Sequence, residues 1–386
     1  MADIIKTVDS ILPEIVQLRH ELHRIPEIAF KEFKTSARIR EYLGGLGLTL
    51  EKPVLGTDVT AVLHGAKPGK TILLRADIDA LPIEEETGVP YCSEHIGFAH
   101  SCGHDGHMAI LLAAAKILSQ RKDQISGCIK FLFSPAEESD AGTKLLVEKG
   151  YLEQFPVPDE AYALHGWPGV KSGCVECCTG PIMASTSDFL ITLSGSGGHG
   201  AVPKDAVDLV GAAAGFILDV KKFASTIQSD DEEPVISVCA VNGGSTFNVF
   251  PQKLILKGTT RFLKDSIGKL IEERIKNLLD RNVLSVGAKY AIEHPKPDYT
   301  AVVNNPALFE KVENIACEYI EKENWNGNGI CSMCGDDFGF ITRCIPSVYF
   351  HLGVGEDHAA LHNPAYDFDD NALKNGILMM CAIALR

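Results

Sequence analysis

Hydrophobic residues in the first 180 positions follow two alternating patterns. Apolar side chains at helical spacing predict helices over 4–24, 36–46, 108–118 and 142–148. Short continuous apolar runs predict strands at 59–63, 71–74, 128–133 and 160–164. Strands that alternate with helices indicate an α/β fold, with a doubly wound, mostly parallel sheet and helices on both faces.

The pattern changes at Gly180 and Pro181. The predicted elements that follow have the order strand, helix, strand, strand, helix, strand, at 187–193, 206–223, 235–241, 253–262, 267–279 and 288–293. This order favours a smaller α+β sandwich inserted into the first domain. A helix at 306–323, a strand at 347–351 and a helix at 371–385 then complete the first domain. We therefore expect a catalytic domain of residues 1–180 and 293–386, and an inserted domain of residues 181–292.

Composition narrows the class of protein. The net charge of −15 over 386 residues argues against a nucleic-acid-binding surface. No apolar run approaches the roughly 18 to 20 residues that span a bilayer, so we expect no membrane partner. The first residues lack the pattern of a signal peptide, and the 12 cysteines are therefore interpreted as reduced thiols in a cytoplasmic protein.

Potential metal ligands gather where the predicted strands end. They are Asp77, Asp79, Cys102, His104 and His107 after the 71–74 strand, Glu137 and Glu138 after the 128–133 strand, His165 after the 160–164 strand, and His358 and His362 near the C-terminus. Parallel strands present their carboxyl ends at one edge of a sheet, so these side chains are expected to meet there. Carboxylate, thiolate and imidazole together suit Zn²⁺, Mn²⁺, Co²⁺ or Ni²⁺ better than Ca²⁺ or Mg²⁺.

The adjacent residues Glu137 and Glu138 indicate two roles. Neighbouring side chains in an extended segment point in different directions, so both are not expected to bind one metal in the same way. The pattern favours one metal ligand and one general base that takes a proton from water.

Two weaker motifs have less specific interpretations. The segment 195–200 matches the glycine-rich dinucleotide pattern, but Pro203 and Lys204 follow directly, and a loop that presents His199 is the preferred interpretation. Residues 174–177 and 331–334 each read C-x-x-C. A structural zinc site would require the two pairs to meet, and incidental thiols are the preferred interpretation.

The ordered motifs resemble those of a known family. They include RADIDALP at 75–82, CGHDGH at 102–107, PAEE at 135–138, HGWP at 165–168, GGHGAVP at 197–203 and LHNP at 361–364. In these the chain resembles the di-metal amidohydrolases and peptidases related to aminoacylase. The resemblance is to the branch that holds hippurate hydrolase, N-acyl-amino-acid amidohydrolases and plant auxin-conjugate hydrolases, and it extends over essentially the whole chain.

This resemblance implies a role for each site residue. The implied ligands of two divalent metal ions are Cys102, His104, Glu138, His165 and His362. Glu137 would be the general base, and Asp79 would orient a ligand. On the inserted domain, His199 would stabilise the oxyanion, in the family often in the partner subunit's site, while Asn248 and Arg261 would hold the substrate carboxylate. The inserted domain would also make a homodimer contact.

The sequence therefore predicts a metal-dependent hydrolase that cleaves the amide bond of N-acyl-L-amino acids to a carboxylate and a free amino acid. A dipeptidase or carboxypeptidase on the same scaffold is the first alternative. A non-catalytic member that binds a small molecule is the second.

Overall fold

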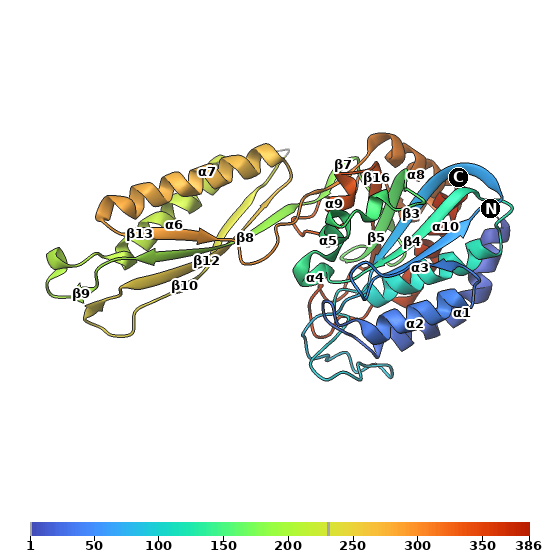
Figure 1. The fold of residues 1–386 in the computed structure, drawn as a ribbon, viewed down its shortest axis with the longest axis horizontal. Coiled ribbons are helices and arrows are strands. Elements are labelled where there is room, and N and C mark those ends of the chain that lie inside the picture. The colour runs from blue at the N-terminus through green and yellow to red at the C-terminus, as the bar shows by residue number, and fades with distance from the viewer. Residues whose placement is uncertain (1, 230–231) are drawn as a thin grey trace. The chain divides into compact units, whose positions relative to one another are not determined.

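The computed structural model describes residues 2–229 and 232–386, which form two compact units. The first contains the residues up to Ile182 together with Val302–Cys331 and Asp337–Arg386. The second contains Met183–Ala301 and Ser332–Asp336. Both units are shown in Figure 1.

The first unit is built on an eight-stranded sheet with the order β1-β2-β4-β3-β5-β16-β6-β15. Its strands are β1 (Thr49–Leu50), β2 (Val59–His64), β3 (Lys67–Asp77), β4 (Ser126–Ser134), β5 (Glu160–Pro168), β6 (Val175–Glu176), β15 (Trp325–Asn326) and β16 (Ser347–Gly355). The four central strands, β4, β3, β5 and β16, are parallel. Their carboxyl ends therefore lie at one edge of the sheet, as the α/β prediction requires.

Helices cover both faces of this sheet (Figure 1). They are α1 (Ala2–His23), α2 (Phe33–Gly44), α3 (His104–Ser119), α4 (Glu137–Asp140), α5 (Gly142–Glu148), α8 (Pro306–Tyr319), α9 (Gly339–Thr342) and α10 (Leu373–Ala384). Helices α1, α3 and α10 pack against one another, and α5 contacts α9. After its polar first turn, helix α3 is apolar on nearly all sides and almost wholly buried, so its sequence shows little amphipathic pattern.

The second unit is an antiparallel sheet with the strand order β10-β12-β8-β13 and two helices on one face (Figure 1). Its elements are β8 (Ser185–Ser194), α6 (Leu209–Thr226), β10 (Val235–Asn242), β12 (Lys253–Phe262), α7 (Asp265–Asn282) and β13 (Lys289–Glu293). Alternate residues of β8, including Phe189, Ile191 and Leu193, form a core with both helices. The expected α+β sandwich is confirmed. A short strand pair, β9 (Gly198–His199) and β11 (Val249–Phe250), lies outside this sheet.

Several element boundaries differ from the sequence prediction by a few residues, among them those of α3 and α8. Helix α3 begins at His104, about one turn before the predicted start at 108. The residues of this extra turn are polar but buried, and a hydrophobic pattern does not identify such residues as core. Helix α8 ends at Tyr319 rather than at 323.

The second unit extends beyond β13. Thr186 and Tyr299 exchange two backbone hydrogen bonds, of 3.0 and 2.9 Å, so residues 293–301 pack with this unit. A small strand pair, β7 (Gly180–Met183) with β14 (Val302–Asn304), lies where the chain passes between the units. Within the described residues, no helix has the length and apolar character needed to cross a membrane.

Candidate metal centre

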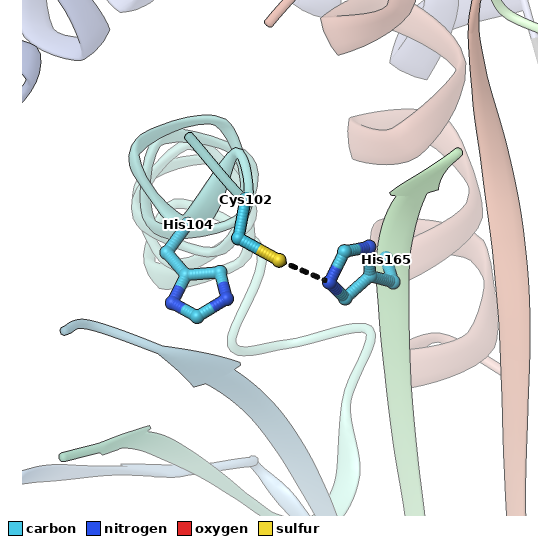
Figure 2. A group of neighbouring side chains, drawn as sticks. All are labelled: Cys102, His104 and His165. Atoms are coloured by element: carbon cyan, nitrogen blue, oxygen red, sulfur yellow. Dashed lines mark hydrogen bonds between the residues drawn. The ribbon is translucent and has the colours of Figure 1, made fainter. Parts of the chain in front are cut away.

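A glycine in the left-handed backbone conformation positions the first two candidate ligands of the site. Gly103 has φ +84°, and a Cβ atom there would lie 2.7 Å from the hydroxyl oxygen of Tyr366. Glycine is therefore required both for the backbone conformation and for the space. The turn places Cys102 just before α3 and His104 in its first turn, and both side chains are buried. Figure 2 shows them beside His165 of β5.

Cys102 and His165 come from different elements and meet directly. The Cys102 sulfur lies 3.4 Å from Nε2 of His165. The other ring nitrogen of His165, Nδ1, lies 2.8 Å from the carbonyl oxygen of Gly166. A proton on Nδ1 would donate to that carbonyl and leave Nε2, which faces Cys102, with its lone pair available.

His104 is oriented in the same way. Its Nδ1 lies 2.9 Å from the backbone carbonyl of Asp79. Its Nε2 is buried without a hydrogen-bond partner and lies 3.8 Å from Oε1 of Glu138, which is also buried and without a partner. An imidazole nitrogen and a carboxylate oxygen that are both buried and unpartnered are donor atoms that a cation would satisfy.

Glu138 joins this group to the C-terminal loop. Its Oε2 lies 3.3 Å from Nε2 of His362. His362 itself has φ +63°, and its backbone N–H donates to the carbonyl of Ser101 at 2.8 Å. That bond connects the C-terminal loop to the residue preceding Cys102, so the loop brings an imidazole from the end of the chain to the site.

The five residues implied as ligands therefore lie in one cluster. Donor atoms lie within 4.8 Å of one another in the groups Cys102–His104–His165, Cys102–Glu138–His362 and His104–Glu137–Glu138. The thiol, imidazole and carboxylate set matches first-row divalent metals. The residues fit a metal both by donor chemistry and by the unpartnered atoms of His104 and Glu138.

Excess negative charge surrounds the cluster. Burial lowers the pKa of His104, but the carboxylates of Asp77 and Asp79 outweigh burial and raise it to about 10. Burial and the carboxylates of Glu138 and Glu137 raise the pKa of the Cys102 thiol well above its usual range. A divalent cation would neutralise this negative potential, and it would favour the thiolate over the thiol.

His107 is near the cluster but has both ring nitrogens engaged. Its Nδ1 lies 2.6 Å from Oδ1 of Asp77, and its Nε2 accepts the backbone N–H of Gly166 at 2.8 Å. A neutral imidazole with a proton on Nδ1 satisfies both bonds. Although Asp77, His104 and His107 lie close enough to hold an ion, this bonding assigns His107 to positioning the strand that carries His165.

The residues 135–138 form a tight turn, named here the PAEE turn, that presents Glu137 and Glu138. Ala136 has φ +60° and ψ +36°, a conformation that costs a non-glycine residue about 1 kcal/mol. Asp79 accepts the backbone N–H of Glu137 on Oδ1 and that of Glu138 on Oδ2, both at 3.0 Å. The two glutamates begin helix α4 rather than lying in the extended segment that the sequence analysis assumed.

A buried arginine beneath the site was not identified from the sequence. Arg75 donates to Asp77 at 2.8 Å and also to Asp337, which in turn accepts the backbone N–H of Thr143 at 2.7 Å. Arg75 lies within RADIDALP, one of the motifs that carry the family resemblance. The charge pairing of Arg75 was the available signal, because a strand-interior arginine requires a buried acid.

The three remaining predicted residues lie in the second unit. His199 pairs with Val249 in the β9–β11 ladder, and its Nδ1 accepts the backbone N–H of Ala201 at 3.1 Å. The carbonyl of Asn248 accepts the N–H of Gly200 at 2.7 Å, so His199 and Asn248 share one small structure. Arg261 lies on β12, with Nη1 3.7 Å from Asp188. Their functions remain predictions.

The C-x-x-C cysteines belong to none of these groups. Among the described residues, no set of potential metal ligands within 4.8 Å includes Cys174, Cys177, Cys331 or Cys334.

Comparison with known proteins identifies relatives over nearly the whole chain. Residues 73–386 match the sequence profile of Peptidase family M20/M25/M40. An N-acetyldiaminopimelate deacetylase of Limosilactobacillus reuteri (strain DSM 20016) is 35% identical over 373 residues, 94% of this chain and 95% of that protein. An N-acetyl-L-cysteine deacetylase of Bacillus subtilis (strain 168) is 33% identical over 365 residues, 93% of this chain and 85% of that protein. The crystal structure of the Bacillus subtilis YXEP protein, described as a dinuclear metal binding peptidase from the M20 family, superimposes with a TM-score of 0.85 at 27% identity over 98% of both chains.

Proposed function

The chain belongs to Peptidase family M20/M25/M40 and is a metal-dependent hydrolase of amide bonds, and we propose that its substrate is an N-acyl-L-amino acid, cleaved to a carboxylate and a free amino acid. The observation that carries this proposal is the PAEE turn, where Asp79 holds Glu137 and Glu138 beside the Cys102, His104, His165 and His362 donors. The names of the deacetylase relatives make N-acetyl compounds the first substrates to test.

Each residue of the cluster has a role in this proposal. Cys102, His104, Glu138, His165 and His362 would hold two divalent ions of zinc, manganese, cobalt or nickel. Bound there, these ions would polarise the amide carbonyl and increase the acidity of water. Glu137 takes the proton from the attacking water and transfers it to the leaving nitrogen as the C–N bond breaks. Asp79 keeps the backbone of Glu137 and Glu138 fixed through the reaction.

The second unit would contribute substrate contacts. We assign His199 to the developing oxyanion, because an imidazole at the tip of a short exposed strand pair can donate a hydrogen bond to it. Asn248 and Arg261 are assigned to the substrate carboxylate, for which a guanidinium fork is well suited.

We also propose a homodimer formed through the second unit. Strand β10 is an edge strand of its sheet, and Val241 on it is 53% exposed. Helix α6 contacts β10 and carries the exposed apolar residues Val210 and Leu218, while Phe247 is exposed in the segment after β10. An open edge flanked by apolar side chains is self-complementary across a two-fold axis, which favours a second copy as the partner.

A cytoplasmic location is retained as part of this proposal.

The test is amine release from a panel of N-acyl-L-amino acids, headed by N-acetyl-L-cysteine and N-acetyldiaminopimelate, with Gly-X dipeptides in parallel. The metal-reconstituted wild type is compared with Glu137→Gln and with Glu148→Gln, an exposed control on α5. We expect acyl-amino-acid hydrolysis that falls by about 10²-fold or more in Glu137→Gln with metal still bound, and no change in Glu148→Gln.

Other outcomes would redirect the assignment. Hydrolysis of the dipeptides alone would favour the dipeptidase on the same scaffold. Ligand binding without hydrolysis of any substrate, with two metals bound, would favour the non-catalytic member. Full activity in Glu137→Gln would move the general base to another residue.

A further inference from the structure

A fully buried glutamate contacts the PAEE turn from a distant part of the sequence. Glu32 precedes helix α2, and its relative exposure is 0%. Its Oε1 accepts the backbone N–H of Ala136 at 3.0 Å. Desolvating a carboxyl group is costly, so a fully buried glutamate whose side chain accepts a backbone amide of the PAEE turn needs an explanation.

The bond from Glu32 completes a regular arrangement. Three consecutive backbone amides, those of Ala136, Glu137 and Glu138, donate to two carboxyl groups at 3.0 Å each. Asp79 takes the second and third of these amides, and Glu32 takes the first. The first is the amide of the residue with φ +60°, where the backbone changes direction before the two glutamates.

The opposite side of the turn is also fixed. The carbonyl of Ala136 accepts the N–H of Gly142 at 3.1 Å, and a Cβ atom on Gly142 would lie 1.8 Å from the carbonyl oxygen of Pro135. The carbonyl of Ala136 is thus bonded to the α5 segment, and the N–H of the same residue, which lies in the preceding peptide group, needs a separate acceptor. Glu32 supplies that contact.

We propose that Glu32 is a positioning residue for the reaction: with Asp79 it holds the backbone amides of 136–138, so that the Glu137 and Glu138 side chains leave the turn in fixed directions. This inference rests on the proposed function of Glu137 and Glu138. Glu32 acts through the backbone and does not touch the reacting atoms.

The surroundings of Glu32 indicate which substitution preserves its role. Burial, together with the nearby negative charge of Asp79, raises the pKa of Glu32 to about 7. A carboxyl that is partly neutral near physiological pH needs no charge to accept the Ala136 amide. Glutamine keeps an oxygen acceptor at the same distance along the side chain, whereas methionine has similar length and no comparable acceptor.

The experiment compares Glu32→Gln and Glu32→Met in the whole, metal-reconstituted protein. A matched control is Glu27→Met, because Glu27 accepts the N–H groups of Lys34 and Thr35 at the start of the same helix without contacting the turn. We expect kcat of Glu32→Met to fall about 10- to 100-fold, with KM little changed, and that of Glu32→Gln to stay within about threefold of wild type. Glu27→Met should lose thermal stability and keep its kcat.

Amide hydrogen exchange of the peptide that contains residues 136–138 makes the test independent of substrate. We expect faster exchange in Glu32→Met than in Glu32→Gln and in the Glu27→Met control. This expectation holds even if no panel substrate is cleaved, a result that would overturn the proposed function alone. Wild-type kcat in folded Glu32→Met, equal losses in the Gln and Met variants, or unchanged exchange at 136–138 would overturn the positioning role.

Discussion

Nε2 of His107 accepts the backbone N–H of Gly166 at 2.8 Å, one residue after His165. The same ring binds Asp77 through Nδ1. His107 therefore connects α3 to β5 at the point where each element contributes a predicted metal ligand. His104 and His107 lie in one helical turn, but their ring nitrogens meet different partners, so we predict different functions for them.

This difference predicts opposite outcomes for two alanine variants. His107→Ala should leave Asp77 and the Gly166 amide without their partner and lower the free energy of unfolding by about 1–3 kcal/mol, while two metals still bind. His104→Ala should remove a ligand and lower the metal content. Metal analysis after dialysis, with denaturant unfolding, separates them. Loss of metal in His107→Ala as complete as in His104→Ala would contradict the assignment of His107.

Asp79→Asn tests the carboxylate that holds the two glutamates. An asparagine side chain has one oxygen, so its amino group would face a backbone N–H and one of the two bonds at 3.0 Å would be lost. We expect a fall of about 10- to 100-fold in kcat or in metal affinity. Calorimetric metal titration and initial rates measure both, with the exposed Asp123→Asn as the control. Wild-type values for both quantities in Asp79→Asn would argue against this role.

The proposed dimer predicts a position-specific effect of charge. Val241→Lys places a cation on the open edge strand β10, which should weaken edge-to-edge association. Val286→Lys, at a similarly exposed apolar residue away from β10, should leave it unchanged. Sedimentation velocity over a range of concentrations measures the dimer fraction. A wild type that is monomeric throughout, or equal effects of both variants, would exclude this interface.

Stability should decrease in alkaline solution because of His23. Burial lowers the pKa of His23, but Asp105 at 2.9 Å and Glu85 at 3.3 Å outweigh burial and raise it to about 10. Because this value lies above that of the unfolded chain, roughly 6.5, the charged histidine stabilises the fold fully below pH 6.5. That contribution is lost as pH rises toward 10.

The comparison for this prediction is His23→Gln. The wild type should be the more stable protein at pH 6, and the difference in unfolding free energy should narrow steadily between pH 6.5 and 10. Chemical unfolding at fixed metal concentration measures the difference. A gap that stays constant over this pH range would show that His23 does not remain protonated in the folded protein.

The sequence by itself determined the fold class, the insertion of a second sandwich and the residue types of the site. The alternation of strand and helix periods is a local feature of the sequence, and so are the ligand-rich segments after the strands. The order of the motifs identified the family. These features could be read because apolar periodicity follows directly from helix and strand geometry. Buried polar residues such as those from His104 to His107 do not follow this pattern, which is why the start of α3 was predicted too late.

Only the tertiary structure showed which partners each polar side chain meets. The spacing of His104 and His107 does not distinguish the two rings, whereas in the fold His104 meets the carbonyl of Asp79 and His107 meets the amide of Gly166. The sequence does not distinguish Glu32 from the other acidic residues, whereas in the fold it contacts Ala136, 104 positions away. Such roles depend on hydrogen-bond partners that lie far apart along the chain, and the spacing of residues does not specify those partners.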